Sequence, residues 1–263
     1  GNGLGAFALT EPNAGSDAGS VAARARLKGD KYILNGAKAF ITNGSHATVF
    51  VVIARTADTP GPRGLSAFIV ERGTPGLIVG PDEKKMGLRA SSTTPLTFED
   101  CAIPKANLLG REGEGFKVAM IALDSGRIGI ASQAIGIARA CFDEAVRYSL
   151  ERRQFGKPIA KFQALQWMIA NADRDIHAAY LMALHAAALK EDGQPFTREA
   201  SIAKLFATEA ANRIAYDALQ IHGGYGYIQE YKIERLYRDA RITTIYEGTS
   251  EVQRIVIANH ILK

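Results

Sequence analysis

A carboxylate immediately before a helix start is the feature of this sequence best suited to chemistry. Glu247 precedes Gly248, which gives a tight turn its conformational freedom. Ser250 and Gln253 follow with the spacing of a capping box, which predicts a helix from about residue 250. The unpaired N–H groups of a helix N-terminus suit an anion such as a phosphate. The segment therefore indicates either a carboxylate held beside an anion site or a surface glutamate before an ordinary capped helix.

Two stretches in the first half of the chain could contact a polar or aromatic ligand. Residues 10–17 (TEPNAGSD) are rich in hydroxyls, small side chains and backbone N–H groups, so they could wrap a polar ligand or form only a turn. Residues 40–43 (FITN) place an aromatic ring beside a hydroxyl and an amide. A flat heterocycle could lie on that ring, although an ordinary strand end has the same composition.

Two stretches in the second half could bind a nucleotide. Residues 152–156 (RRQFG) combine two cations with an aromatic ring, which suits a phosphate beside a ring system but is also typical of a helix C-terminus. Residues 223–227 (GGYGY) would let the backbone approach a ligand closely, or would simply end a helix. His222 lacks a second ligand at metal spacing, so a structural role is expected for it and no metal site is predicted.

Residues 1–110 predict a β domain. Short apolar runs bounded by turn residues predict strands at residues 32–34, 49–54, 65–70 and 96–98. Asn35-Gly36 predicts a two-residue hairpin turn, and Asn43-Gly44 predicts a second turn. Many short strands with frequent turns favour an antiparallel barrel or sandwich.

Residues 111–263 predict a helical domain, because glycine and proline become rare and apolar residues recur at helical spacing. The predicted helices span residues 116–151, 162–191, 197–222 and 231–238, followed by the helix from about residue 250. Long amphipathic helices with short links favour an antiparallel four-helix bundle. The change of texture falls between Asn107 and Gly115, so an α+β chain with a β domain followed by a bundle is expected.

The composition narrows the class of protein. A length of 263 residues with 47% hydrophobic residues permits a sizeable core, and no run is long and apolar enough to span a membrane. The net charge of +5 could attract a polyanionic cofactor, but the basic residues are spread along the chain, which disfavours nucleic acid as a partner. Cys101 and Cys141 have no metal spacing and make a poor disulfide framework, which favours a reducing compartment.

Taken together, these stretches resemble the acyl-CoA dehydrogenase family, and its short-chain (butyryl-CoA) type most closely. The resemblance keeps its order and spacing along the whole chain, which is more specific than any single motif. It is carried by residues 7–17, 40–43, 124–131, 151–159, 220–227 and 238–241, and by the segment around Glu247.

The resemblance implies a fold and a reaction. Members of the family are expected to have an N-terminal helical domain, a middle β domain and a C-terminal four-helix bundle, with FAD between the last two and reaching a neighbouring subunit. The N-terminal helical domain is absent from this sequence, so the chain is expected to be similar to a fragment, a truncated product or one half of a split enzyme. The implied reaction is FAD-dependent α,β-dehydrogenation of a short-chain acyl-CoA, with electron-transfer flavoprotein as the acceptor.

The resemblance also assigns roles to individual residues. Glu247 is expected to be the catalytic base. The expected FAD contacts are Phe7, Leu9, Thr10, Gly15, Ser16, Phe40, Ile41, Thr42, Arg152, Gln154, Phe155, Gln163, Gln220, Gly223, Gly224, Thr249 and Glu251. The expected substrate contacts are Ser16, Asp124, Arg127, Tyr246 and Gly248. Some relatives carry the base on the first long helix, where this chain has Gly126, so Glu247 is the only candidate.

The resemblance further implies a homotetramer built as a dimer of dimers. It places the protein in the bacterial cytoplasm, or alternatively in the mitochondrial matrix. Two other functions stay open on the same residues: a non-catalytic assembly subunit of the same fold, and an acyl-CoA oxidase that passes electrons to oxygen.

Overall fold

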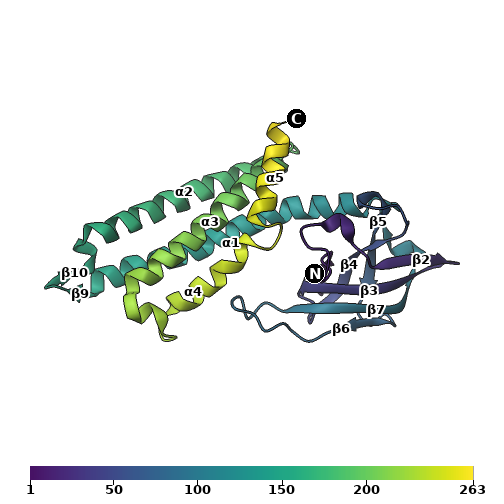
Figure 1. The fold of residues 1–263 in the computed structure, drawn as a ribbon, viewed down its shortest axis with the longest axis horizontal. Coiled ribbons are helices and arrows are strands. Elements are labelled where there is room, and N and C mark those ends of the chain that lie inside the picture. The colour runs from purple at the N-terminus through teal and green to yellow at the C-terminus, as the bar shows by residue number, and fades with distance from the viewer. Residues whose placement is uncertain (263) are drawn as a thin grey trace. The chain divides into compact units, whose positions relative to one another are not determined.

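The computed structural model describes residues 1–262, and the last residue of the predicted 111–263 region lies outside this range. The described chain divides into two compact units (Figure 1). The first contains Gly1–Lys85 and Arg89–Ala122, and the second contains Met86–Leu88 and the residues from Leu123 onwards. The long first helix begins in the first unit and continues into the second.

The first unit is built on one mixed sheet of eight strands. The strands are β1 (Leu4–Ala8), β2 (Arg24–Lys28), β3 (Lys31–Thr42), β4 (Ala47–Arg55), β5 (Leu65–Glu71), β6 (Leu77–Val79), β7 (Thr93–Pro104) and β8 (Leu108–Leu109). They follow the order β6-β7-β3-β2-β4-β5-β8, with β1 paired to β4. All four predicted runs are confirmed as parts of β3, β4, β5 and β7.

The sheet differs in two ways from a simple antiparallel barrel. β1 pairs with β4 in parallel, from Leu4 opposite Ala47 to Ala8 opposite Val52, so the sheet is mixed. Among the described residues the strand path has two ends, β6 and β8, so it does not close into a barrel. The side chains of Phe50, Phe68 and Phe98 are fully or almost fully buried and form the centre of the core.

The turn expected at Asn35-Gly36 is wrong, because both residues lie inside the long strand β3. The turn that joins β2 to β3 is formed instead by Gly29 and Asp30, with Gly29 at a φ of +62°. The pairing of β3 with β7 shifts register at residue 36, and the Asn35 side chain bonds Asp100 on β7 at 3.0 and 2.8 Å. Gly36 is required there because a Cβ would lie 2.7 Å from Ala23.

The Asn43-Gly44 turn is confirmed. It joins β3 to β4, with Asn43 in the left-handed region at a φ of +63°. The Gly44 N–H donates to the Ile41 carbonyl at 3.2 Å, and the His46 N–H donates to the Asn43 carbonyl at 2.9 Å.

The second unit is helical. Its helices are α1 (Gly115–Glu151), α2 (Gln163–Glu191), α3 (Thr197–His222), α4 (Lys232–Ala240) and α5 (Ser250–Ile261), with a small strand pair β9 (Arg153–Gln154) and β10 (Lys157–Pro158) after α1. The predicted helices agree with these bounds within two residues, and α3 agrees at both ends. α2 and α3 run side by side, joined by a short link (Figure 1). The α+β class is confirmed.

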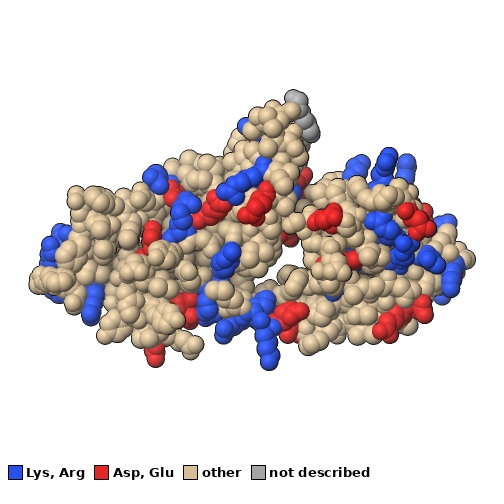
Figure 2. All heavy atoms as spheres, viewed as in Figure 1, with Lys and Arg blue, Asp and Glu red and all other residues tan. Residues whose placement is uncertain are grey.

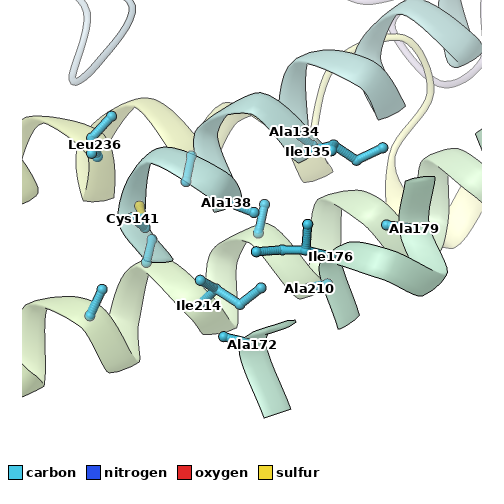
Figure 3. Packing of buried hydrophobic residues seen from close by; sticks show 14 of the residues in the cluster. Ala134, Ile135, Ala138, Cys141, Ala172, Ile176, Ala179, Ala210, Ile214 and Leu236 are labelled. Carbon is cyan, nitrogen blue, oxygen red and sulfur yellow. The ribbon is translucent and has the colours of Figure 1, made fainter. Parts of the chain in front are cut away.

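The core of the second unit consists mainly of alanine. Figure 3 shows Ala138 of α1, Ala179 of α2 and Ala210 of α3 packed together with the larger side chains of Ile176 and Ile214. Small side chains at the contact let helix axes approach closely, and the isoleucines fill the remaining space. Residues of α1 and α3 thus share one core, and both helices also carry residues of the candidate site.

Two further expectations concern the surface and the cysteines. No helix of the described residues is long and apolar enough to cross a lipid bilayer. Lys and Arg side chains are interspersed with Asp and Glu on the face shown in Figure 2. Cys101 and Cys141 are buried free thiols, and burial raises the pKa of Cys101 to about 11 and that of Cys141 to about 12, so both are expected to be unreactive.

Candidate active site

Glu247 lies on a strained turn directly before α5. Its φ is +54° and that of Gly248 is +87°, so two consecutive residues occupy the left-handed region. A non-glycine residue in this region costs energy, and such strain is commonly found at functional sites. The helix is capped by the Thr249 hydroxyl, which accepts from the Val252 N–H at 3.3 Å.

The predicted capping box of Ser250 and Gln253 is therefore wrong by one position. Ser250 is the first residue of α5, and its buried hydroxyl has no partner among the described residues. The Gln253 amide does not reach the N-cap N–H. It donates instead to the carbonyls of Glu247 at 3.1 Å and Gly248 at 2.9 Å, because the left-handed turn points both carbonyls at it.

The Glu247 carboxylate is partly buried against α1. A Cβ on Gly126 would lie 3.1 Å from the carboxyl carbon of Glu247 and still closer to one of its oxygens, so the absence of a side chain at residue 126 makes room for the acid. Burial raises the pKa of Glu247, while the positive charges of Arg127 and Lys204 oppose that rise. A carboxyl group with a raised pKa beside fixed cations is typical of an acid–base site.

Arg127 ties α1 to the start of α3. Its guanidinium pairs with Asp124 at 2.5 Å and donates to Ser201 at 3.3 Å, and Asp124 accepts from the Thr197 hydroxyl at 2.6 Å. Arg127 is buried and its Nε–H has no partner among the described residues. Asp124 and Arg127, both predicted substrate contacts, are thus brought to the same place as the acid.

Tyr246 fixes the other side of the turn. Its hydroxyl donates to the Gln133 side chain on α1, and burial raises the pKa of Tyr246 to about 12, so the phenol stays neutral and acts as a donor. Together, Glu247, Tyr246 and Gly248 form one group of predicted residues that the second unit assembles.

A second group lies in the first unit, where the loop after β1 meets the end of β3. Glu11 anchors that loop: its carboxylate accepts from the N–H groups of Ala22 at 2.7 Å and Ala23 at 3.0 Å, and from Lys38 at 2.7 Å. Lys38 also donates to the Leu9 carbonyl at 3.0 Å, and both charged side chains are buried. A buried ion pair with all these hydrogen bonds fixes the loop against the strand.

Phe40 projects from this strand as an exposed ring. Its φ is +57°, the register between β3 and β7 shifts between Lys38 and Ile41, and the Phe40 side chain is 64% exposed. A bulge re-aims a side chain, and an aromatic ring held outward at a strained position is suited to stack on a flat ligand. Of the other predicted residues, Leu9 and Ile41 are buried, Phe7 and Thr10 are partly buried, and Gly15, Ser16 and Thr42 are exposed.

A third group lies where α1 ends and α3 ends. A pocket of about 540 Å³ is lined by Arg152, Gln154, Gly223 and Gly224 among the predicted residues. Arg152 lies over the Tyr225 ring at 5.3 Å, and Gly223 ends α3 at a φ of +58°, as the glycine pair predicts. Cation, open backbone and aromatic ring together suit a phosphate-bearing nucleotide.

Five predicted FAD contacts of the second unit lie outside this pocket lining: Phe155, Gln163, Gln220, Thr249 and Glu251. Phe155 is 90% exposed at a φ of +51°, and its ring meets Phe162 edge-on at 6.0 Å. Gln163 begins α2 and Gln220 lies in the last turn of α3, both exposed. Glu251 is exposed on the first turn of α5, where hydrogen bonds to its own backbone N–H and the Thr249 hydroxyl lower its pKa.

Sequence reasoning missed several residues of these groups, Lys38 among them. Lys204 faces Glu247, Gln133 holds Tyr246, and Tyr148 lines the nucleotide-sized pocket, stacked on His222 with ring centroids 4.3 Å apart. A signal for Lys204 exists, because it stands at helical spacing within a row of alanines, where a solvated lysine would not fit. His222 has the structural role expected of it, since it bonds the Ala218 carbonyl at 2.7 Å.

An α+β chain with a partly buried acid at a helix start and a pocket lined by a cation and glycine backbone has the features of an enzyme that binds a phosphate-bearing ligand. Residues 6–101 match the family model "Acyl-CoA dehydrogenase, middle domain" and residues 113–262 match "Acyl-CoA dehydrogenase, C-terminal domain". The chain therefore belongs to the acyl-CoA dehydrogenase family, whose members are FAD-dependent flavoproteins.

Three known proteins illustrate the similarity. The acryloyl-CoA reductase (NADH) of Anaerotignum propionicum is 54% identical over 262 residues, which cover 99% of this chain and 66% of that protein. The mitochondrial short-chain specific acyl-CoA dehydrogenase of Rattus norvegicus is 54% identical over 263 residues, which cover 100% of this chain and 64% of that protein. The butyryl-CoA dehydrogenase structure from Megasphaera elsdenii superposes with a TM-score of 0.98 at 50% identity, covering 99% and 68%. The chain thus spans about two thirds of the length of these relatives.

The residues present fit the flavin cofactor of the family. The first unit offers the outward ring of Phe40 beside a loop fixed by a buried ion pair. The second unit offers the pocket with Arg152, open glycine backbone and an aromatic ring. These are the partners that a flat ring system and a pyrophosphate need.

Proposed function

We propose that this protein is a short-chain acyl-CoA dehydrogenase that converts an acyl-CoA into the trans-2-enoyl-CoA with FAD as cofactor. The observation that carries the proposal is the Glu247 carboxylate, held on a strained turn, facing Gly126, with its pKa raised by burial. A general base works best when its pKa lies near the working pH, and burial moves a carboxyl group in that direction.

Glu247 removes the proton from the α-carbon of the thioester. When bound, FAD would supply the acceptor for the β-hydrogen, which leaves as a hydride. The acid is too weak a base for a free thioester, so the developing enolate needs hydrogen-bond donors at the thioester oxygen, and the N–H of Glu247 itself is the proposed protein donor. The neighbouring helix N-terminus favours the ionised acid by only about 0.3–1 kcal/mol, so exclusion of water on substrate binding is expected to dominate and raise the pKa further.

The proposed binding residues divide between the two units. Phe40, Ile41 and Thr42 are proposed to contact the isoalloxazine, and the loop with Thr10 and Ser16 is proposed to line the flavin and the thioester arm. The further proposed FAD contacts are Phe7, Leu9, Gly15, Arg152, Gln154, Phe155, Gln163, Gln220, Gly223, Gly224, Thr249 and Glu251.

The pocket with Arg152 and Gly223-Gly224 is proposed to hold the nucleotide end of FAD from a neighbouring subunit of a homotetramer. Its cation, open backbone and aromatic ring support this assignment. The proposed substrate contacts, besides Ser16, are Asp124, Arg127, Tyr246 and Gly248. Residues 1–110 and 111–263 are proposed as the two domains that carry these contacts.

The experiment is an anaerobic titration of the FAD-loaded protein with butyryl-CoA. The proposal predicts that the flavin absorbance bleaches, that butyryl-CoA acts faster than longer acyl-CoAs, and that electron-transfer flavoprotein reoxidises the enzyme. A yellow protein that no acyl-CoA bleaches, or a colourless protein that binds only a helical partner, would support the assembly-subunit alternative. Stoichiometric hydrogen peroxide in air would support the oxidase alternative.

A second candidate is the reverse reaction, reduction of a 2-enoyl-CoA. It is favoured by the 54% identity to an acryloyl-CoA reductase, which equals the identity to the short-chain dehydrogenase. The same Glu247 would then donate a proton to the α-carbon. Turnover of the oxidised, FAD-loaded protein with NADH and acryloyl-CoA separates the two directions. Oxidation of NADH coupled to formation of propionyl-CoA would support the reductase, whereas flavin reduction by butyryl-CoA without any oxidation of NADH would support the dehydrogenase. The cytoplasm of a bacterium is the proposed location, with the mitochondrial matrix as the alternative.

A further inference from the structure

Lys204 is a fully buried cation in the alanine-rich face of α3. Its side chain has no exposure to solvent, and its helical neighbours Ala200, Ala203 and Ala207 are buried with it. Removing an ammonium group from water is costly, and an apolar side chain of similar length would fill the same space without that cost. The family resemblance gave Lys204 no role, so its burial needs a separate explanation.

The contacts of Lys204 supply that explanation. Its Nζ donates to the Gly248 carbonyl at 2.8 Å. The same carbonyl accepts from Gln253 at 2.9 Å, and Gln253 also holds the Glu247 carbonyl at 3.1 Å. Both donor side chains are fully buried. The two strained peptides of the turn are therefore fixed by donors from α3 and α5, which keeps the Glu247 side chain directed at Gly126.

The charges around the turn are also organised by Lys204. Arg127 on α1 and Lys204 on α3 face the Glu247 carboxylate, and Tyr246 is the neighbouring neutral phenol. Burial lowers the pKa of Lys204 to about 8, while the negative charge of Glu247 opposes that fall. Arg127 repels Lys204, and the negative charges of Glu251 and Glu209 attract it more weakly than that of Glu247.

We propose that Lys204 is a positioning residue for the catalytic base: it clamps the Gly248 peptide so that Glu247 faces its reaction partner, and it places a buried positive charge beside the turn. The inference rests on the proposed function and deepens it, because it names a residue that acts through Glu247 and does not contact the substrate. Arg127 supplies the second positive charge, but its hydrogen bonds go to Asp124 and Ser201, so it does not hold the turn.

The test compares Lys204→Met with Lys204→Arg and with the surface control Lys190→Met, which lies exposed in the last turn of α2. Each FAD-loaded variant is mixed anaerobically with butyryl-CoA across a range of pH. The measured quantity is the rate of flavin reduction as a function of pH. We expect its midpoint to lie roughly one pH unit higher in K204M than in the wild type, because an opposite charge nearby lowers a carboxyl pKa by about that amount. K204R keeps the positive charge and is expected to have a midpoint close to that of the wild type, and K190M is expected to match the wild type.

A readout that needs no turnover separates this inference from the proposed function. The protonation midpoint of Glu247 is measured by infrared difference spectroscopy of the carboxyl stretch, with Glu247→Gln to assign the band. K204M is expected to raise this midpoint whether or not butyryl-CoA reduces the flavin. If K204M does not fold, Lys204→Gln replaces it, with the same expected rise. An unchanged midpoint and pH profile in the folded variant would overturn the role of Lys204, whereas failure of the wild type to be reduced would overturn only the proposed function.

Discussion

Placing a single methyl group at residue 126 should impair the proposed chemistry while leaving the fold intact. Gly126 lies on α1 opposite the Glu247 carboxylate, and a Cβ there would be 3.1 Å from the carboxyl carbon. Optimal carbon–carbon contacts lie at about 3.5–4.0 Å, so the acid must move by roughly 0.5–1 Å. Gly126→Ala therefore displaces the base without removing it.

The effects on stability and on activity should separate. Replacing glycine by alanine inside a helix is favourable by about 1 kcal/mol, and overpacking a contact costs about 1–3 kcal/mol, so the unfolding free energy is expected to fall by about 0–2 kcal/mol. A misplacement of about 1 Å at a reacting group can cost on the order of 100-fold in rate. We expect G126A to bind FAD normally, to unfold near the wild-type temperature and to be reduced by butyryl-CoA about 100-fold more slowly.

The matched control is Gly129→Ala, three residues further along the same helix. A Cβ on Gly129 meets no atom within 4 Å, so this variant gains the helix preference without a clash. Thermal unfolding and rapid-mixing flavin reduction are measured for both variants. Reduction of G126A at the rate of G129A would refute the placement of the Glu247 carboxylate against α1.

Three further predictions follow from the same contacts. Because burial raises the pKa of Glu247, the folded protein binds the Glu247 proton more tightly than the unfolded chain, and this contribution to stability is lost as pH rises through the folded pKa. Glu247→Gln should therefore melt at a higher temperature than the wild type at neutral pH. The difference in melting temperature should vanish in acid, which calorimetry across a range of pH can measure. Glu11→Ala leaves the buried Lys38 unpaired and should lower the free energy of unfolding, measured in denaturant, by about 3–5 kcal/mol. The control is Asp58→Ala, which breaks the surface pair Arg24–Asp58, and an equal loss of unfolding free energy in that variant would contradict this reasoning. Phe40→Gly removes a left-handed, strained residue and should stabilise the FAD-free protein by about 1 kcal/mol. The same substitution removes the aromatic ring and should weaken FAD binding. An unchanged FAD affinity would exclude stacking of the flavin on Phe40.

The sequence predicted helices and strands correctly where the same pattern of apolar residues repeats over many positions. α3 agrees at both ends because helical periodicity runs between Thr197 and the glycine pair that stops it. The Asn35-Gly36 hairpin failed because the signal is local, whereas the strand continues through a bulge that depends on Ala23, which precedes β2, and on Asp100 of β7. Turn chemistry alone could not reveal those tertiary contacts.

In the candidate site, too, residue spacing predicted some features, whereas others depend on tertiary packing. The spacing of residues around Glu247 indicated an acid at a helix start, and the structure places it there. The capping box failed because Gln253 satisfies the carbonyls of a left-handed turn, a conformation that no spacing in the sequence specified. Lys204 lies 43 residues from Glu247 (247 − 204), and only the packing of α3 beside the turn brings it close.

The measurement that tests the central claim most directly is anaerobic flavin reduction in Glu247→Gln. Glutamine keeps the size of the side chain but cannot accept the α-proton. The account predicts unchanged FAD content and a rate of reduction by butyryl-CoA that falls by about 10²–10⁴-fold, the usual contribution of a general base. Reduction at a near-normal rate with FAD bound would show that Glu247 is not the base.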